Sequence, residues 1–326
     1  MFSMGNKALV VGIDAYPRAP LHGCCNDANC VAQLLERNED DSPNFSVRKV
    51  LNVSTLKDLR NLLRELFSGD SDIALFFFSG HGYLGEDGGY LVLPDFEDGE
   101  EGLKTKELLE MANRSAANNR IVILDCCHAG KITRPDQEQS GPPPINRGTT
   151  ILAACSEKES AIEDAGHGVF TTLLIEGLKG GAAGITGAVT PSGIYAYIDR
   201  SLDAWEQRPV FATNVRNFIP VRKCSPPVSH DILRKIPQYF PSPMDKFRLD
   251  PSFEDTNVPN VKHTILEPYA NPKNVAIFKD LQELQRIGLV IPEDEQYMYF
   301  AAIHSKSCRL TPLGRHFWNV ATKGLL

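Results

Sequence analysis

Short apolar runs recur along the first half of the chain, and each run is bounded by polar residues or glycine. Continuous runs of this kind are typical of strands that are covered on both faces. They predict strands at residues 8–13, 73–78, 121–124 and 150–154, with a weaker strand at 48–53.

Segments with helical spacing alternate with these runs. The clearest spans 55–67, which follows a Ser-Thr pair suited to capping and repeats leucine along one face. Further helices are predicted at 26–37, 104–113, 170–178 and 194–205. Strands that alternate with helices in this way predict an α/β fold with a mostly parallel sheet flanked by helices.

Composition predicts how the chain is divided. Residues 131–148 are polar and rich in proline, which predicts a loop. Residues 223–262 contain seven prolines and show little periodicity, so we expect a linker that lies on the surface. The expected domains are therefore residues 1–222 and a smaller α+β domain over 263–326.

The last segment has its own pattern. An amphipathic helix is predicted at 274–289, followed by a strand at 297–303 and a second strand that ends at Thr311. A short helix is expected to begin at Pro312.

Charge and cysteine content restrict the function further. The chain of 326 residues carries a net charge of −7, which does not favour a non-specific grip on nucleic acid. No apolar run reaches the roughly 18 residues of a membrane span, and the N-terminus lacks the pattern of a signal peptide. The expected compartment is therefore the cytoplasm, where the eight cysteines should be mostly reduced thiols.

Two predicted strands end in chemically reactive turns. The run at 73–78 is followed by Ser-Gly-His-Gly, and the run at 121–124 by Asp-Cys-Cys-His-Ala-Gly. Reactive groups collect at the carboxyl ends of strands in an open parallel sheet, so a histidine and a cysteine should meet there. A thiolate can attack a carbonyl carbon while an imidazole protonates the leaving amine. The alternative is that either residue only packs at its strand end.

The stretches FFFSGHG and LDCCHAG resemble those of caspase-like cysteine peptidases, and of the metacaspase and orthocaspase branch most of all. The resemblance implies that Cys127 is the nucleophile and His81 the general base and acid. It also implies that the backbone amides of Gly82 and Cys127 lie near the oxyanion. Cys126 is then assigned to packing. The two catalytic positions lie 46 residues apart, near the separation of about 50 typical of caspases.

A third stretch, LHGCCND, resembles a turn that follows the first strand of metacaspases. The resemblance implies a specificity pocket lined by Cys24, Asp27, Ser79 and Asp125. Two carboxylates in one partly dry pocket favour a cationic partner. The expected substrates are therefore proteins or peptides with Arg or Lys before the scissile bond. The alternative is that the two acids only cap helices.

The same resemblance bears on metals and self-processing. Many metacaspases bind calcium through clustered acids, but the acids at 95–101 lack the paired aspartates, and Arg134 stands where an acid is common. The cysteines and histidine at 22–30 lack the CxxC spacing of a zinc site. No metal or other cofactor is therefore expected. Lys131, Arg134 and Arg147 follow the nucleophile in a predicted loop and are candidate self-cleavage sites.

Residues 274–322 resemble the second half of a winged helix. DNA binding needs a basic recognition face, and the helix at 278–286 is not strongly basic. We therefore expect a regulatory domain that takes an activating partner or a small nucleotide messenger, as in bacterial caspase-like proteins of anti-phage defence. Nucleic acid and membrane are not expected partners. The alternatives are a non-catalytic scaffold, a DNA-binding regulator and a cysteine hydrolase that acts on non-peptide amides.

Overall fold

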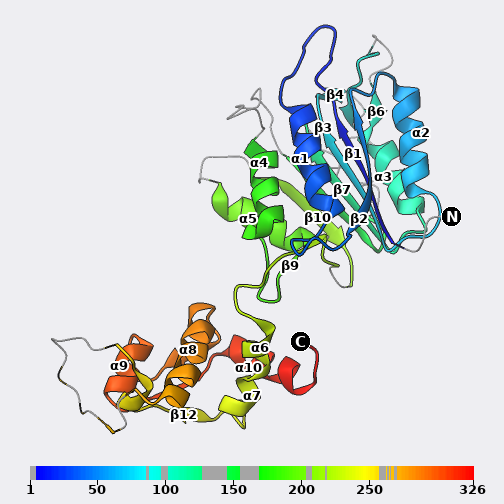
Figure 1. Cartoon of the computed structure of the whole chain (residues 1–326). Coiled ribbons are helices and arrows are strands. Elements are labelled where there is room, and N and C mark those ends of the chain that lie inside the picture. The colour runs from blue at the N-terminus through cyan, green and yellow to red at the C-terminus, as the bar shows by residue number, and fades with distance from the viewer. Residues whose placement is uncertain are drawn as a thin grey trace. The chain divides into compact units, whose positions relative to one another are not determined.

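The computed structural model describes residues 5–85, 88–96, 102–126, 145–154, 169–202, 208–216, 219–256, 262, 264, 266–267 and 270–326. The chain forms two compact units, a first unit of Met1–Ser225 and a second unit of Pro226–Leu326. Figure 1 shows the elements of both units.

The first unit is built on a sheet in the strand order β10-β8-β7-β3-β1-β2. Its strands are β1 (Asn6–Gly12), β2 (Phe45–Leu51), β3 (Ile73–Ser79), β7 (Asn119–Asp125), β8 (Thr149–Ala153) and β10 (Val210–Asn214). All neighbours pair in parallel except β10, which pairs antiparallel to β8. The predicted α/β fold and its five strands are confirmed, and the edge strand β10 is an addition.

Helices cover both faces of this sheet (Figure 1). One face packs against α1 (Cys24–Glu36), α4 (Val169–Glu176) and α5 (Pro191–Ser201), and the other against α2 (Leu56–Phe67) and α3 (Thr105–Arg114). Successive strand residues point to opposite faces, so Phe76 and Phe78 join the α2 and α3 side while Phe77 joins the α1 and α4 side. This alternation continues to the strand ends, where the reactive turns begin.

Smaller elements complete the first unit. A three-stranded antiparallel sheet of β4 (Gly82–Gly85), β5 (Gly88–Leu91) and β6 (Leu103–Lys104) follows His81 directly. A π-helical turn (Gly177–Gly181) follows α4, and β9 (Ala188–Val189) pairs antiparallel with β11 (Arg222–Lys223).

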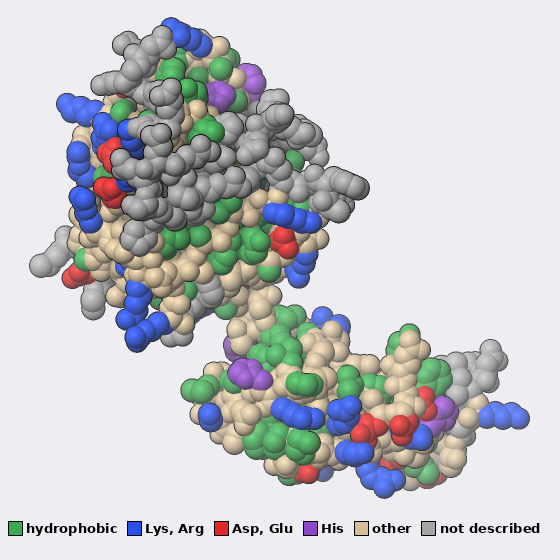
Figure 2. All heavy atoms as spheres, turned by 180° about the vertical axis from the view of Figure 1, so that it is seen from behind, with side chains coloured by type: hydrophobic (Ala, Val, Ile, Leu, Met, Phe, Trp, Pro, Cys, Tyr) green, Lys and Arg blue, Asp and Glu red, His purple; other side chains and the backbone are tan. Residues whose placement is uncertain are grey.

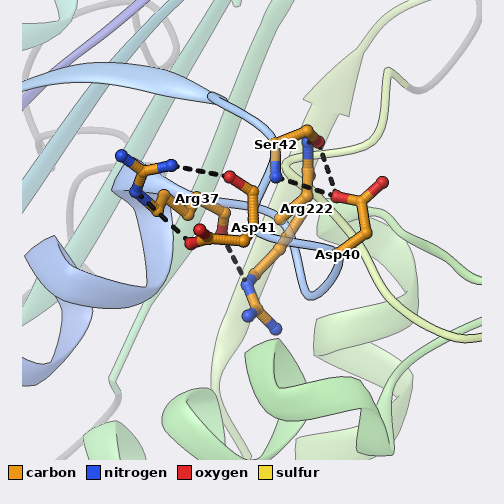
Figure 3. Close-up of polar contacts among 6 residues, drawn as sticks. Arg37, Asp40, Asp41, Ser42 and Arg222 are labelled. Atoms are coloured by element: carbon orange, nitrogen blue, oxygen red, sulfur yellow. Dashed lines mark hydrogen bonds and ion pairs between the residues drawn. The ribbon is translucent and has the colours of Figure 1, made fainter.

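The turn after α1 binds the last strand of the first unit. Arg222 donates from Nε to the carbonyl of Arg37 at 3.0 Å, as Figure 3 shows, and from its Nη1 to the carbonyl of Leu178 at 2.8 Å. Within the turn, Arg37 binds the carbonyl of Asp41 at 2.6 Å, and the backbone N–H of Ser42 donates to a side-chain oxygen of Asp40 at 3.1 Å (Figure 3). The segment that leads to the second unit is therefore fixed by a buried guanidinium.

The second unit differs from the predicted linker and small domain. Its elements are α6 (His230–Arg234), α7 (Ile236–Tyr239), β12 (Lys246–Arg248), a 3₁₀ turn (Pro251–Phe253), α8 (Pro272–Arg286), β13 (Val290–Pro292), α9 (Met298–Ile303), β14 (Ser307–Leu310) and α10 (Pro312–Thr322). Leu233, Ile236 and Phe240 are buried, so residues after 225 form part of the core of this unit and not a surface linker. Two of the prolines there, Pro237 and Pro251, lie at the second and first positions of short helical turns, where proline is tolerated.

One predicted strand of the second unit is wrong. Met298–Ile303 form α9, because Met298, Ala301 and Ala302 recur at helical spacing and are all buried. The helix near 274–289, the strand before Thr311 and the helix from Pro312 are confirmed as α8, β14 and α10. The strands form an antiparallel sheet in the order β12-β14-β13.

Candidate functional site

The carboxyl ends of three neighbouring strands lie level with one another. Gly12 at the end of β1 pairs with Ser79 at the end of β3, and Ser79 pairs with Asp125 at the end of β7. The backbone N–H of Gly80 then donates to the carbonyl of Asp125 at 3.2 Å. The two turns that carry His81 and the cysteine pair therefore leave the sheet from adjacent strands.

Neighbouring groups hold His81 at this edge. Its backbone N–H donates to the Tyr16 hydroxyl at 3.0 Å, and its carbonyl accepts from the backbone N–H of Val92 at 3.0 Å. The rings of Tyr16 and His81 lie 4.5 Å apart between centroids. The imidazole Nε2 lies 2.7 Å from the carbonyl oxygen of Ala19.

The bond to Ala19 decides the chemistry open to the imidazole. A carbonyl oxygen only accepts hydrogen bonds, so Nε2 carries the proton. In the neutral ring Nδ1 is then the nitrogen that can take a proton from a thiol. The hydrogen bond to the Ala19 carbonyl thus orients the His81 imidazole so that it can act as a base through Nδ1.

Tyr16 and Gly80 form the support beneath His81. The Tyr16 hydroxyl donates to the carbonyl of Val92 at 3.1 Å while it accepts from His81. Burial raises the pKa of Tyr16, which keeps this hydroxyl protonated as the bridge requires. A Cβ on Gly80 would meet the Tyr16 oxygen at 2.5 Å, so the glycine of the Ser-Gly-His turn makes room for this contact.

The cysteine pair is only partly described. Cys126 is buried at 6% exposure and joins the apolar cluster on the α2 and α3 side of the sheet. Cys127, the predicted nucleophile, lies outside the described residues, as do Lys131 and Arg134. Gly82, the predicted oxyanion residue, is the first residue of β4.

The four predicted pocket residues lie together beside this edge. The Ser79 hydroxyl donates to Asp27 Oδ2 at 3.0 Å, and both side chains are buried at 2% exposure. The Cys24 thiol shares a hydrogen bond with Ser79 and lies within the field of both acids. The Thr171 hydroxyl, from α4, donates to Asp125 Oδ2 at 2.5 Å. Among the described residues, Asp125 makes no ion pair.

Burial and mutual repulsion set the charge of these two acids. Burial raises the pKa of Asp125 to about 6, and the neighbouring Asp27 acts in the same direction, while hydrogen bonds from Thr171 oppose the change. Burial also raises the pKa of the Cys24 thiol, which therefore stays neutral. An acid with this pKa is mostly ionised at neutral pH, and a cation entering the pocket would favour the ionised form further.

The start of α1, which carries Cys24, is fixed by side chains from the segments after β1 and β2. Asp14, just beyond β1, accepts the backbone N–H groups of Cys24 at 2.9 Å and Cys25 at 3.2 Å. Asn52 Oδ1 in turn accepts the backbone N–H of Asp14 at 2.9 Å. A Cβ on Gly12 would lie 2.2 Å from the Cys24 carbonyl, so glycine permits the close approach of strand and helix.

The third candidate self-cleavage site, Arg147, lies in a fixed segment before β8. The buried Arg120 donates to the Arg147 carbonyl at 2.6 Å and to the Thr149 hydroxyl at 3.2 Å. The backbone N–H of Gly148 donates to the carbonyl of Asn214 at 2.6 Å. The peptide bond after Arg147 is therefore held on both sides.

Sequence reasoning missed three groups of this site: the Tyr16 hydroxyl, the Ala19 carbonyl and the Thr171 hydroxyl. None belongs to a motif, and each meets the site only through tertiary structure.

The acid Asp95, considered for calcium, accepts the backbone N–H of Leu56 at 3.0 Å at the start of α2. Across the described ranges, no group of three or more His, Cys, Asp and Glu side chains is arranged to hold a metal ion. No helix there is long and apolar enough to cross a membrane.

A mostly parallel α/β sheet flanked by helices, with His81, Asp27 and Asp125 near its carboxyl edge, is the arrangement of a caspase-like fold. A family model described as the caspase domain matches residues 6–215, and the chain belongs to this family. Among solved structures, the chain is similar to a crystal structure of a Geobacter sulfurreducens protein, with 18% identity and a TM-score of 0.49 over 65% of this chain and 94% of that one. A search of curated proteins finds no match.

Proposed function

We propose that the protein is a cysteine endopeptidase that cleaves after Arg or Lys, with Cys127 as nucleophile and His81 as base and acid. The observation that supports the dyad is the bond from His81 Nε2 to the Ala19 carbonyl, which leaves Nδ1 as the nitrogen able to accept a thiol proton. His81 Nδ1 takes the thiol proton of Cys127, and the resulting thiolate then adds to the scissile carbonyl carbon. The imidazolium then protonates the leaving amine as the peptide C–N bond breaks, and water, deprotonated by His81, hydrolyses the resulting thioester to release the acid and free Cys127.

The basic specificity is supported by the acidic pair of Asp27 and Asp125. A pair of like charges that is partly withdrawn from water is costly when alone and becomes favourable when a cation enters between them. A guanidinium matches this site well, because it can bind two carboxylates through its fork of donors. An aspartate side chain would instead meet two acids, so cleavage after Asp is not expected.

The test is cleavage of fluorogenic peptides with Arg, Lys, Asp or Leu before the bond. Wild type should cleave after Arg and Lys, and Cys127→Ala should abolish cleavage. Cys126→Ala is the matched control, because it removes a neighbouring thiol that packs in the core. Activity that survives Cys127→Ala would refute the dyad, and preferred cleavage after Asp or Leu would refute the pocket. Chelation of calcium should leave the rates unchanged.

We also propose that the second unit regulates the peptidase. The strand order β12-β14-β13, with α8 directly before β13, is compatible with the winged-helix likeness. Basic residues of α8 are neutralised locally, since Lys279 pairs with Asp255 at 3.0 Å and Arg286 with Glu283 at 2.6 Å. Figure 2 shows acidic and basic side chains intermixed on this unit. These pairs favour a docking or sensing role over DNA binding.

The regulatory role predicts activation by a partner or a small nucleotide. Peptide cleavage should rise when wild type is mixed with a lysate of phage-infected cells or with a panel of cyclic nucleotides, and Cys127→Ala should stay inactive. DNA affinity that falls steeply between about 50 and 200 mM salt would instead favour the DNA-binding alternative.

A further inference from the structure

The strongest observation outside the predicted motifs is the contact between α4 and β7. Thr171 is fully buried on α4, and its hydroxyl donates to Asp125 Oδ2 at 2.5 Å. The backbone N–H of Thr171 also donates to this carboxyl. A buried hydroxyl needs a partner, and here the partner is an acid of the proposed pocket.

The two pocket acids share one arrangement. Asp27 accepts the hydroxyl of Ser79, and Asp125 accepts the hydroxyl of Thr171. Each carboxyl thus meets a neutral hydroxyl from a neighbouring element. The titratable groups that face Asp125 from the packed elements of the described chain are Asp27 and Cys24, both from α1, and no described cation faces it.

We propose that Thr171 is a positioning residue for basic specificity, which holds the Asp125 carboxylate in the orientation that receives the substrate cation. The inference rests on the proposed function of the pocket. With Oδ2 held by the Thr171 hydroxyl, the second oxygen of Asp125 is directed to the incoming guanidinium or ammonium. The hydroxyl also stabilises the ionised carboxylate against burial and against Asp27.

A merely structural role is the rival explanation, because Asp125 also caps the first turn of α4. The two roles differ in what Thr171→Val changes. Valine has nearly the same shape and keeps the backbone N–H, so the cap remains, while the hydroxyl is lost. A structural residue would alter stability and affect all substrates alike. A positioning residue changes the preference between charged and uncharged side chains.

The experiment compares Thr171→Val, Thr171→Ser and Thr150→Val in the full chain. Thr150 is the matched control, since it is also buried and its hydroxyl binds Thr213 at 2.8 Å near the other end of β8. We expect Thr171→Val to raise KM for Arg peptides about tenfold, the effect of losing a hydrogen bond to an ionised group. KM for a Leu peptide should not rise. Thr171→Ser should recover most of the affinity, and Thr150→Val should resemble wild type.

Two further readouts separate the possible failures. Alkylation of Cys127 by iodoacetamide does not use the pocket, so its rate should be equal in wild type and Thr171→Val. Carbon-13 titration of the Asp125 carboxyl, assigned with Asp125→Asn, should show a midpoint that rises above about 6 in Thr171→Val.

Equal KM and equal midpoints in Thr171→Val and wild type would overturn the inference while the proposed function stands. Loss of Arg and Leu cleavage alike, with Thr171→Ser no better, would also overturn it in favour of a structural role. A wild type that alkylates at Cys127 but cleaves only after uncharged residues would overturn the proposed specificity, and the inference with it.

Discussion

Gly80 offers a direct test of how the His81 turn is built. A Cβ at this position would lie 2.5 Å from the Tyr16 hydroxyl oxygen and 2.9 Å from the edge of the Phe78 ring. Both distances are shorter than ordinary contacts, so Gly80→Ala must displace Tyr16. Overpacking of this kind costs about 1–3 kcal/mol. In a domain of this size the melting temperature should fall by roughly 2–4 °C for each kcal/mol.

Tyr16→Phe provides the second half of a double-mutant cycle. Alone, it leaves the His81 backbone N–H and the Val92 carbonyl without their hydroxyl partner, at a cost of about 1–3 kcal/mol. Combined with Gly80→Ala, it also removes the oxygen that the new Cβ would strike. The loss of stability in the double variant should therefore be smaller than the sum of the losses in the two single variants, by a coupling energy of about 1 kcal/mol or more. The contact with Phe78 remains, so the rescue should be partial.

The assay is calorimetric unfolding of the full chain, which can separate the transitions of the two units. Gly184→Ala is the matched control, because its Cβ would meet nothing closer than 3.7 Å, and it should stay within about 0.5 kcal/mol of wild type. Peptide cleavage should fall in Gly80→Ala, since His81 moves with Tyr16. Strictly additive effects would refute the reasoning, because Gly80 would then not be making room for the hydroxyl.

Four further predictions concern charged groups. Because folding raises the pKa of Asp125 from 3.8 to about 6, the contribution of this group to stability falls as pH rises between these values. Asp125→Asn should therefore raise the melting temperature more at pH 8 than at pH 4. Equal changes in melting temperature at the two pH values would contradict the raised pKa. For the same reason, KM for Arg peptides in wild type should rise as pH falls through about 6, with no such rise for Leu peptides. Arg222→Leu should destabilise the first unit by about 2–5 kcal/mol in calorimetry, because carbonyls including that of Arg37 lose their donor, and an unchanged transition would contradict its role. Arg147→Gln should leave the masses of any self-processed fragments unchanged, whereas a fragment that disappears would show that the bond is cleaved despite its fixed carbonyl.

The fold could be predicted from the sequence because burial on two faces leaves a clear mark. The runs at 73–78 and 121–124 had to be strands, since they are continuous, short and end in glycine or polar residues. The prediction failed where residue preference and periodicity disagreed. In α9 the aromatic residues favour a strand, but packing on Met298, Ala301 and Ala302 decides for a helix.

The candidate site could be predicted only as far as its motifs reach. Ser79 and Asp125 end adjacent strands, and strand alternation places both on the side of α1 and α4. Their partners come from other parts of the chain: Asp27 from the first helix and Thr171 from a helix beyond β8. No local pattern marks Thr171, because a threonine in a helix is ordinary until the helix is packed against the sheet.

The same alternation separates the two adjacent cysteines. Val122, Leu124 and Cys126 all join the cluster beneath α2 and α3, so the period of two that governs β7 continues one residue beyond its end. The Cys126 side chain is thereby committed to the core, where a thiol acts as a small apolar group. A thiol that is both buried and packed cannot reach a substrate carbonyl without breaking the cluster. Cys126→Ser should therefore lower stability by burying a hydroxyl, while the alkylation rate of Cys127, the proposed nucleophile, should stay unchanged.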